Sequence, residues 1–170
     1  MQSALFIGRF QPFHNGHLEV IKEMASQVDK LIIAIGSAQE SHTLDDPFTA
    51  GERHLMISET LDEMDILNYF LIPIVDINRY SVWVAHVRSL VPPFDIVFTN
   101  NDLTARLFSE AGIEVRRTRI YDRERYSGKL VREAILAGRD WRSLVPSGTV
   151  KVIEAIDGEK RMRELAGDAR

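Results

Sequence analysis

Apolar residues gather in five short runs along the chain, over residues 3–8, 29–37, 69–77, 94–100 and 113–117. Short apolar runs bounded by turn residues are typical of strands that are buried on both faces. Segments with a helical pattern separate these runs. The alternation therefore predicts an α/β fold, with a five-stranded parallel sheet covered by helices on both faces.

The segments between the runs carry apolar residues at helical spacing. From Gly16 to about Val28, apolar positions recur every three or four residues, which predicts an amphipathic helix. Further helices are predicted to follow Thr49 as far as about Glu63, and over residues 81–91, 102–112 and 127–138. The remainder, from Asp140 onward, is predicted to be wholly helical.

Local signals mark several element ends. Thr49 and Glu52 have the spacing of a capping box, in which each side chain satisfies a free amide of the other residue. Ser127 is a candidate N-cap, and Gly138 is a candidate for the position just after the helix that it ends. Pro73 cannot donate to a strand ladder, so its strand is expected to lie at the sheet edge or to end there.

Right-handed crossovers make a doubly wound, Rossmann-like sheet the leading architecture. In the common strand order 3-2-1-4-5, the order reverses between the first and fourth strands, and ligands bind beyond the strand ends at that point. The loops at residues 8–17 and 99–102 are predicted to meet there. We predict a single domain over 1–170, with an α/β core at 1–138 and C-terminal helices at 139–170.

Composition narrows the classes of function. The 170 residues are 45% hydrophobic, and 21 basic against 25 acidic side chains give a net charge of −4, which supplies no global footprint for nucleic acid. Cysteine is absent, which excludes disulfides and thiolate–zinc sites. No apolar stretch approaches the roughly 20 residues that span a bilayer, and the first residues lack the basic start of a signal peptide. We expect a cytoplasmic protein with no membrane partner.

The first predicted turn, "GRFQPFHNGH" at residues 8–17, carries the strongest chemical signal. It lacks the glycine patterns of a dinucleotide-binding turn and of a P-loop. Instead it places His-x-Gly-His at a helix N-terminus, where free amides and the helix dipole favour an anion. Gly16 lets a phosphate approach the backbone, and Arg9 adds a permanent charge. Together with His14 and His17 they predict a polyphosphate cradle.

Three other interpretations of this turn are open. The two histidines could cap the helix start without further function. They could ligate zinc, although the sequence contains no His-Glu-x-x-His and a third ligand would have to come from elsewhere. Phe10, Pro12 and Phe13 could serve only for packing.

A second anion site is predicted near residues 116–132, where arginines and a lysine outnumber acids. Such charge runs are usually solvated faces. The segment "YSGKLVR" differs because it opens a helix, with Ser127 at the N-cap and Arg132 one turn later. Because it follows the fifth strand, it is expected at the same sheet edge as the first turn.

These two motifs resemble the pattern of the nucleotidyltransferase α/β phosphodiesterase superfamily. Eight segments in order resemble the archaeal nicotinamide-nucleotide adenylyltransferase family over nearly the whole chain, namely "GRFQPFHNGH", "IGSAQESHTLDDPFTAGER", "IPIVDI", "VWVAHV", "PPFD", "RLFSEAG", "RYSGKLVR" and "DWRSLVP". The resemblance implies transfer of AMP from ATP to nicotinamide mononucleotide (NMN), forming NAD and pyrophosphate with Mg²⁺. It also implies a homo-oligomer, commonly a hexamer.

The resemblance further implies roles for individual residues. The residues expected to act in catalysis on the phosphates are His14, His17, Arg9, Ser127 and Arg132. Those expected to bind ATP are Gly8, Phe10, Gly16, Asn100, Asn101, Tyr126 and Gly128. Those expected to bind NMN are Ser37, Asp76, Ile77 and Trp83, although a helical tryptophan is usually a core residue. No direct protein ligand to a metal is expected, and Mg²⁺ would sit on the ATP phosphates.

Four features depart from the family pattern. Lys129 stands where threonine is usual, Tyr80 where asparagine is common, and Asp45 where some members carry an arginine. The segment "TNND" at 99–102 replaces a more typical Ser-Gly-Asn-Pro.

The implied chemistry agrees with the residues present. The second pKa of a phosphomonoester lies near 6, so the attacking phosphate is ionised at neutral pH and needs no general base.

Three other functions remain open. The enzyme could transfer AMP to another acceptor, such as nicotinate mononucleotide, phosphopantetheine, glycerol phosphate or flavin phosphate. The chain could instead be an RNA-binding module that uses the basic run with Tyr121 and Tyr126, or a catalytically inert nucleotide-binding regulator.

Overall fold

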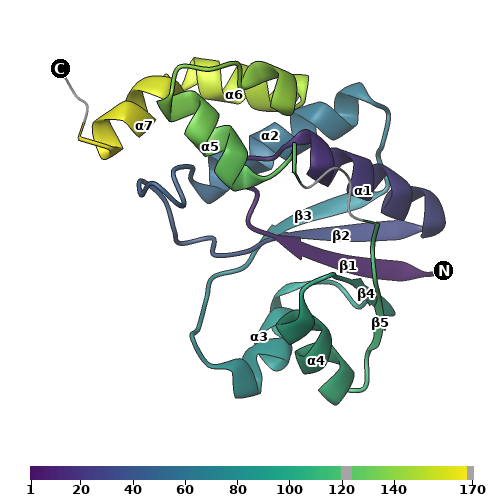
Figure 1. Cartoon of the computed structure of the whole chain (residues 1–170). Helices are drawn as coiled ribbons and strands as arrows, with labels where there is room; N and C mark the ends of the chain where they lie inside the picture. The colour runs from purple at the N-terminus through teal and green to yellow at the C-terminus, as the bar shows by residue number, and fades with distance from the viewer. Residues whose placement is uncertain (120–123, 168–170) are drawn as a thin grey trace.

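The computed structural model describes residues 1–119 and 124–167, and within these ranges it contains a five-stranded parallel sheet (Figure 1). The strands are β1 (Ser3–Gly8), β2 (Lys30–Ile35), β3 (Tyr69–Pro73), β4 (Ile96–Phe98) and β5 (Glu114–Arg116). They lie in the order β3-β2-β1-β4-β5, and every neighbouring pair is parallel. The predicted doubly wound sheet and its strand order are confirmed.

Helices cover both faces of the sheet. They are α1 (Asn15–Gln27), α2 (Ala50–Glu63), α3 (Trp83–Leu90), α4 (Asp102–Glu110), α5 (Gly128–Leu136), α6 (Ser147–Ala155) and α7 (Gly158–Leu165). Figure 1 shows α3 and α4 on one side of the sheet, and the other helices on the opposite side. Single 3₁₀ turns at Tyr80–Val82 and Arg142–Leu144 precede α3 and α6, so the C-terminal part is helical as predicted.

The predicted helix caps are present. The Glu52 amide donates to Thr49 Oγ1 at 3.1 Å, and the Thr49 amide donates back to Glu52 Oε1 at 2.9 Å. Ser127 Oγ accepts from the Leu130 amide at 3.1 Å, and Gly138 follows α5 with a φ of 67°. These contacts fix where α2 and α5 begin, and both starts border the carboxyl edge of the sheet.

Four of the strands are shorter than the apolar runs that predicted them, and β2 ends at Ile35 rather than at residue 37. β3 ends at Pro73 rather than at residue 77, and it is an edge strand, as the proline indicated. β4 covers only Ile96–Phe98, because only these residues pair with β1, and β5 covers only Glu114–Arg116. Apolar residues beyond a ladder still pack against the core, so hydrophobicity alone overextends such strands.

Two apolar clusters lie on the two faces of the sheet. The smaller contains Val84 and Val87 of α3 and Phe108 of α4. The larger contains side chains of α1, α2 and α5, and also Ile153 of α6 and Met162 of α7, both fully buried. The C-terminal helices thus contribute to the same core as the sheet. In the described part of the chain, no helix is long and apolar enough to cross a bilayer.

Candidate active site

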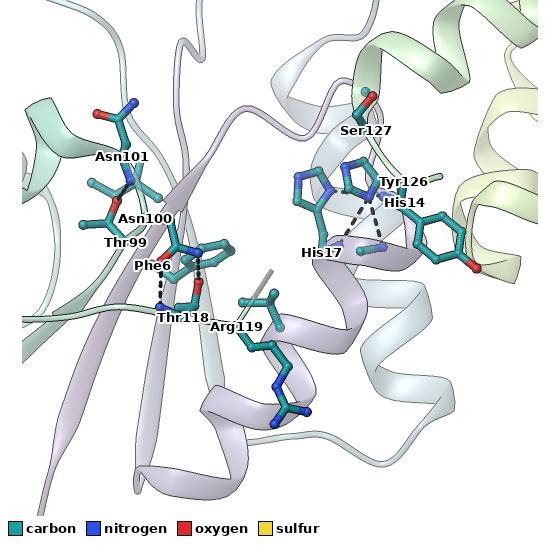
Figure 2. Close-up of a pocket in the computed structure, with 14 residues that line it drawn as sticks. Phe6, His14, His17, Thr99, Asn100, Asn101, Thr118, Arg119, Tyr126 and Ser127 are labelled. Carbon is teal, nitrogen blue, oxygen red and sulfur yellow. Dashed lines mark hydrogen bonds between the residues drawn. The ribbon is translucent and has the colours of Figure 1, made fainter. Parts of the chain in front are cut away.

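A pocket of about 370 Å³ opens at the carboxyl ends of β1 and β4. The N-termini of α1 and α5 border it, and the loop after β4 forms its other side (Figure 2). Its lining residues are Phe6, Ile7, His14, Gly16, His17, Val20, Thr99, Asn100, Asn101, Thr118, Arg119, Tyr126, Ser127 and Gly128. Both loops that were predicted to meet at the reversal of strand order line this pocket.

His14 and His17 form a reciprocal cap at the start of α1. His14 Nδ1 accepts from the amides of Gly16 and His17, at 3.1 and 3.3 Å. The His14 amide in turn donates to His17 Nδ1 at 3.2 Å. The capping interpretation is therefore confirmed, and it does not exclude a ligand, because both side chains also line the pocket.

The capping bonds determine which imidazole nitrogens are free. A neutral imidazole that accepts through Nδ1 carries its proton on Nε2. Burial lowers the pKa of His14 to about 4. Burial and the charge of His14 lower the pKa of His17 well below its usual value. At neutral pH both rings are therefore uncharged, with Nε2–H as the remaining donor.

Aromatic rings pack against the histidine pair. Phe10 lies edge-on to His17 with ring centroids 4.8 Å apart, and Phe13 stacks parallel to His17 at 5.9 Å. Phe10 is 1% exposed and Phe13 is 0% exposed, so the packing interpretation is confirmed for these two rings. Phe10 is also expected to bind ATP; its ring is buried and does not line the pocket, so that role stays a prediction. Gly8 is not a lining residue either; a Cβ there would lie 2.8 Å from the Phe10 ring.

Gly16 and the start of α5 lie close together at one side of the pocket. A Cβ at Gly16 would lie 3.0 Å from the His14 ring and 3.2 Å from Tyr126 Cβ, so a side chain there would fill the approach to the helix amides. Ser127 and Gly128 lie on the α5 side (Figure 2). Eight of the residues expected to act on the phosphates or bind ATP thus border one space, namely His14, Gly16, His17, Asn100, Asn101, Tyr126, Ser127 and Gly128.

The two expected phosphate-binding arginines do not line the pocket in this structure. Arg9 lies at the surface and pairs with Asp46, with Nη1 and Oδ1 3.2 Å apart. Arg132 is half-buried and donates from Nη1 to the Gln11 carbonyl at 2.8 Å. Burial lowers the pKa of Arg132, while the charge of Asp45 raises it. Arg132 therefore ties α5 to the turn that contains the histidines.

The wall opposite the histidines comes from the ends of β4 and β5. Asn100 Nδ2 donates to Thr118 Oγ1 at 2.6 Å, and the Thr118 amide donates to Asn100 Oδ1 at 2.9 Å. Asn101 caps α4 by accepting from the Thr104 amide at 2.9 Å. The sequence predicted Asn100 and Asn101 but missed Thr99, Thr118 and Arg119. Their position directly after two adjacent predicted strands was the available signal.

The basic run at 116–132 divides between the surface and the pocket. Arg116 pairs with Glu114 at 3.1 Å, and Arg117 pairs with Asp102 at 3.1 Å, both at exposed positions. These contacts agree with a solvated face for this part of the run. Tyr121 and Arg123, which belonged to the RNA-binding alternative, lie outside the described residues.

The residues expected to bind NMN lie outside this pocket. Asp76 and Gln39 form two hydrogen bonds with each other. Gln39 Nε2 donates to Asp76 Oδ2 at 2.9 Å, and the Asp76 amide donates to Gln39 Oε1 at 3.0 Å. Ser37 follows β2, and Ile77 follows β3. Trp83 packs edge-on against Phe108 with centroids 5.6 Å apart. Ser37, Asp76 and Ile77 follow the neighbouring strands β2 and β3, and Trp83 begins α3.

The donor set of the pocket suits an anion. Among the described residues, no group of three or more His, Asp or Glu side chains is placed to hold a metal ion. The described lining residues supply amides, hydroxyls, imidazoles and one guanidinium, and include no carboxylate. Such donors bind phosphate oxygens rather than a bare cation.

Comparisons with known proteins agree with this geometry. Residues 5–134 match the cytidylyltransferase-like family. The chain is 52% identical over 169 residues to a nicotinamide-nucleotide adenylyltransferase of Archaeoglobus fulgidus, covering 96% of this chain and 97% of that protein. It is 54% identical over 163 residues to one of Thermoplasma acidophilum, covering 96% and 91%. The chain belongs to the nicotinamide-nucleotide adenylyltransferases of the cytidylyltransferase-like family.

Solved structures share the fold of these adenylyltransferases. A bifunctional NMN adenylyltransferase/ADP ribose pyrophosphatase from Francisella tularensis matches with a TM-score of 0.79 at 19% identity, covering 98% of this chain and 52% of that chain. A second structure of that protein, complexed with AMP and a Mn ion, matches with a TM-score of 0.76. A putative nicotinate-nucleotide adenylyltransferase from Vibrio parahaemolyticus matches with a TM-score of 0.66 at 14% identity. At these identities the likeness establishes the nucleotidyltransferase fold.

Proposed function

We propose that the protein transfers AMP from ATP to nicotinamide mononucleotide, producing NAD and pyrophosphate. The membership of the adenylyltransferase family supports the reaction. The observation in the site that carries it is the capped histidine pair. His14 and His17 lie at the start of α1, each with Nδ1 engaged and Nε2–H left to donate, across the pocket from the start of α5.

The reaction needs alignment and charge stabilisation rather than a base. A phosphate oxygen of NMN attacks the α-phosphorus of ATP, a new P–O bond forms, and the bond to the pyrophosphate oxygen breaks. Because the acceptor phosphate is ionised near neutral pH, no proton has to be removed from it. In our proposal the two imidazoles and the α1 amides donate to oxygens around the α–β bridge as negative charge develops there.

The start of α5 holds the rest of the triphosphate in this proposal. The Ser127 and Gly128 region supplies a helix N-terminus, and Arg132 supplies a fixed cation one turn away. Arg9 joins them by leaving Asp46. That ion pair has an arginine side chain 55% exposed, so breaking it costs little. The adenosine half then lies along the wall formed by Asn100 and Asn101, with Tyr126 on the histidine side of the pocket.

We propose that Mg²⁺ enters as a complex with ATP. The pocket offers donors for phosphate oxygens, so the metal is held by the nucleotide phosphates rather than by side chains. When bound there, Mg²⁺ neutralises charge on the leaving pyrophosphate. The role of the protein in this arrangement is to orient the nucleotide that carries the metal.

We place the NMN end at the β2–β3 side of the histidine turn. Ser37, Asp76 and Ile77 follow β2 and β3 on this side, next to the end of β1, and Trp83 begins the helix after β3. An acceptor that spans from these residues to the histidines would present its phosphate to the α-phosphorus. This assignment accounts for the position of these residues outside the pocket described above.

A panel of acceptors tests the proposed function. Purified protein is incubated with MgATP and either NMN, nicotinate mononucleotide, phosphopantetheine, glycerol phosphate or flavin mononucleotide, and pyrophosphate release is followed. We expect release with NMN and formation of an equal amount of NAD. Release with phosphopantetheine but not with NMN would assign the enzyme to a different acceptor.

We also propose a homo-oligomer, with a hexamer as the expected size, in the cytoplasm. Exposed apolar side chains near the start of α3 support self-association, among them Tyr80 at 66% and Val82 at 40% exposed. Light scattering after gel filtration measures the mass directly. A monomeric mass near 19.4 kDa at micromolar concentration would contradict the assembly.

A further inference from the structure

Arg53, in the first turns of α2, is an arginine with no exposed surface. Buried guanidinium groups are usually paired with a carboxylate, because an uncompensated buried charge is costly. Within residues 1–119 and 124–167, Arg53 makes no ion pair with a carboxylate. Burial lowers the pKa of Arg53, and the charges of Asp46 and Glu52 oppose that shift without a direct contact. The groups that do bind the guanidinium directly indicate what the side chain does.

All five N–H donors of the Arg53 guanidinium bind main-chain carbonyls. Nε donates to the Thr49 carbonyl at 3.2 Å. Nη1 donates to the carbonyls of Arg9 and Gly36, each at 2.8 Å. Nη2 donates to the carbonyls of Ser37 at 3.2 Å and Glu40 at 3.4 Å. A guanidinium has five donors in a planar fork, so every donor is used.

These carbonyls lie where the first two strands separate. Arg9 is the first residue after β1, and Gly36 and Ser37 are the first residues after β2. The last main-chain bond between the two segments joins the Gly36 amide to the Gly8 carbonyl at 2.8 Å. Beyond that bond the strands have no ladder, and Nη1 of Arg53 bridges Arg9 and Gly36 instead.

The backbone next to two of these carbonyls is strained. Phe10, which follows Arg9, has a φ of 54°, and Ser37 has a φ of 46°. Residues other than glycine rarely adopt such angles, and they keep them only where the surrounding structure holds them. The Arg53 bonds to the Arg9 and Ser37 carbonyls are contacts that do so.

We propose that Arg53 is a positioning residue that fixes the ATP-side loop, which contains Arg9 and the histidines, against the acceptor-side loop at Gly36–Glu40. This inference rests on the proposed function, because it takes the first loop to bind ATP and the second to border NMN. Arg53 contacts neither substrate. It sets the distance between the two loops, and hence between the two phosphates that react.

The first test is a double-mutant cycle on ATP binding, measured by calorimetry without an acceptor. Arg9→Ala is made in the wild-type protein and in Arg53→Lys, which keeps the charge but loses the planar fork. In the wild-type background Arg9→Ala is expected to weaken ATP binding about tenfold or more, since it removes a charged donor. In the Arg53→Lys background the same change is expected to cost less than about threefold, because Arg9 is already displaced.

Val87→Ala is the matched control. Val87 is fully buried in the cluster on the opposite face of the sheet and is not assigned to either substrate, so its loss destabilises the fold without removing a substrate contact. In that background Arg9→Ala should keep its full effect. Equal costs of Arg9→Ala in the wild-type and Arg53→Lys backgrounds would overturn the proposal. If circular dichroism shows that Arg53→Lys is unfolded, Arg53→Gln, with a planar amide, takes its place.

The second test is kcat at saturating concentrations of both substrates, at a temperature where each variant is folded. Small displacements of reacting groups can cost about 10²-fold in rate. We expect Arg53→Lys to lose at least about tenfold in kcat and Val87→Ala to stay within about twofold. An unchanged kcat for Arg53→Lys would show that the loops are not coupled through this residue. Failure of the wild-type protein to use NMN would count against the proposed function alone, since the binding cycle needs no acceptor.

Discussion

The imidazole rings of His14 and His17 stack with centroids 3.6 Å apart and planes 24° from parallel. Two protonated rings would repel each other at this distance. Two backbone amides donate to Nδ1 of His14, and one donates to Nδ1 of His17. Because both Nδ1 atoms accept hydrogen bonds, both rings stay neutral and can stack. The pair thus presents uncharged donors to a ligand and is not a source of positive charge.

Replacing His17 by alanine should lower kcat by about 10²–10³-fold, because it removes a donor that acts on developing charge. The matched control is His54→Ala, since His54 lies exposed on α2 and outside the pocket. Steady-state kinetics with varied ATP measures both variants. Near-normal turnover of His17→Ala with unchanged ATP affinity would show that the assignment is wrong.

Stability should fall as the solution becomes acidic. The pKa of His14 is about 4 in the folded protein and near 6.5 in the unfolded chain, so the unfolded chain binds more protons between these values. The stabilisation of the folded protein that follows from the lowered pKa of His14 is complete above about pH 6.5 and is lost as the pH falls towards 4. For His14 alone it amounts to about 3 kcal/mol in the free energy of unfolding. Urea unfolding at pH 7, 6 and 5 measures how the free energy of unfolding changes with pH.

His14→Asn is the informative variant for that prediction. Asparagine is a good N-cap and keeps an acceptor for the α1 amides, but it does not titrate. We expect the variant to lose less stability than the wild-type protein between pH 7 and 5. Parallel pH profiles of the two proteins would mean that His14 titrates normally in the fold.

Arg132→Ala should weaken ATP binding by roughly 10–100-fold, the worth of a charge-assisted hydrogen bond. Lys129→Ala, on the same helix, should change ATP affinity by less than about twofold, because the Lys129 side chain is 76% exposed and pairs only with Glu133 among the described residues. Titration calorimetry compares them. Equal effects of the two changes would indicate a diffuse electrostatic contribution from α5 rather than a specific contact.

Trp83 gives a test of the acceptor side. It packs against Phe108, so Trp83→Ala should cost about 2 kcal/mol of stability whatever else the residue does. Trp83→Phe keeps an aromatic ring in that contact. If Trp83 also lines the NMN site, both variants should raise the KM for NMN and leave the KM for ATP unchanged. An unchanged KM for NMN in Trp83→Phe would make Trp83 a core residue only.

The C-terminal helices should unfold together with the sheet. Met162 of α7 is fully buried in the larger core cluster, so Met162→Ala should lower the free energy of unfolding by about 2–5 kcal/mol. Lys160→Ala, at an exposed position of the same helix, should change it by less than about 0.5 kcal/mol. Calorimetry should show a single transition in each case. Two separate transitions would contradict the predicted single domain over 1–170.

The sequence was sufficient for the fold because its signals are local. Buried parallel strands are continuous apolar runs, and the alternation with helices leaves few topologies. The Thr49–Glu52 capping box and the Ser127 cap were readable for the same reason, since each lies within a few residues. Strand ends were less accurate, as at Pro73, because apolar packing continues after the ladder ends.

The site was predictable in part. The histidine turn and the start of α5 were found because each motif lies within one helix start. Arg53 was missed as a site residue because its partners Arg9 and Gly36 lie 44 and 17 positions away in the chain. Thr118 was missed because its partner Asn100 follows a different strand, 18 positions away in the chain. The contact between Arg9 and Asp46 likewise depends on tertiary structure, because the two residues lie 37 positions apart in the chain.

The central claim is transfer of the adenylyl group to NMN, and labelled ATP tests it most directly. The protein is incubated with NMN, Mg²⁺ and ATP carrying ³²P at either the α or the γ position, and the products are separated. We predict that the α label appears in NAD and the γ label in pyrophosphate. An α label that stays in ATP, or that appears in free AMP without NAD, would contradict it.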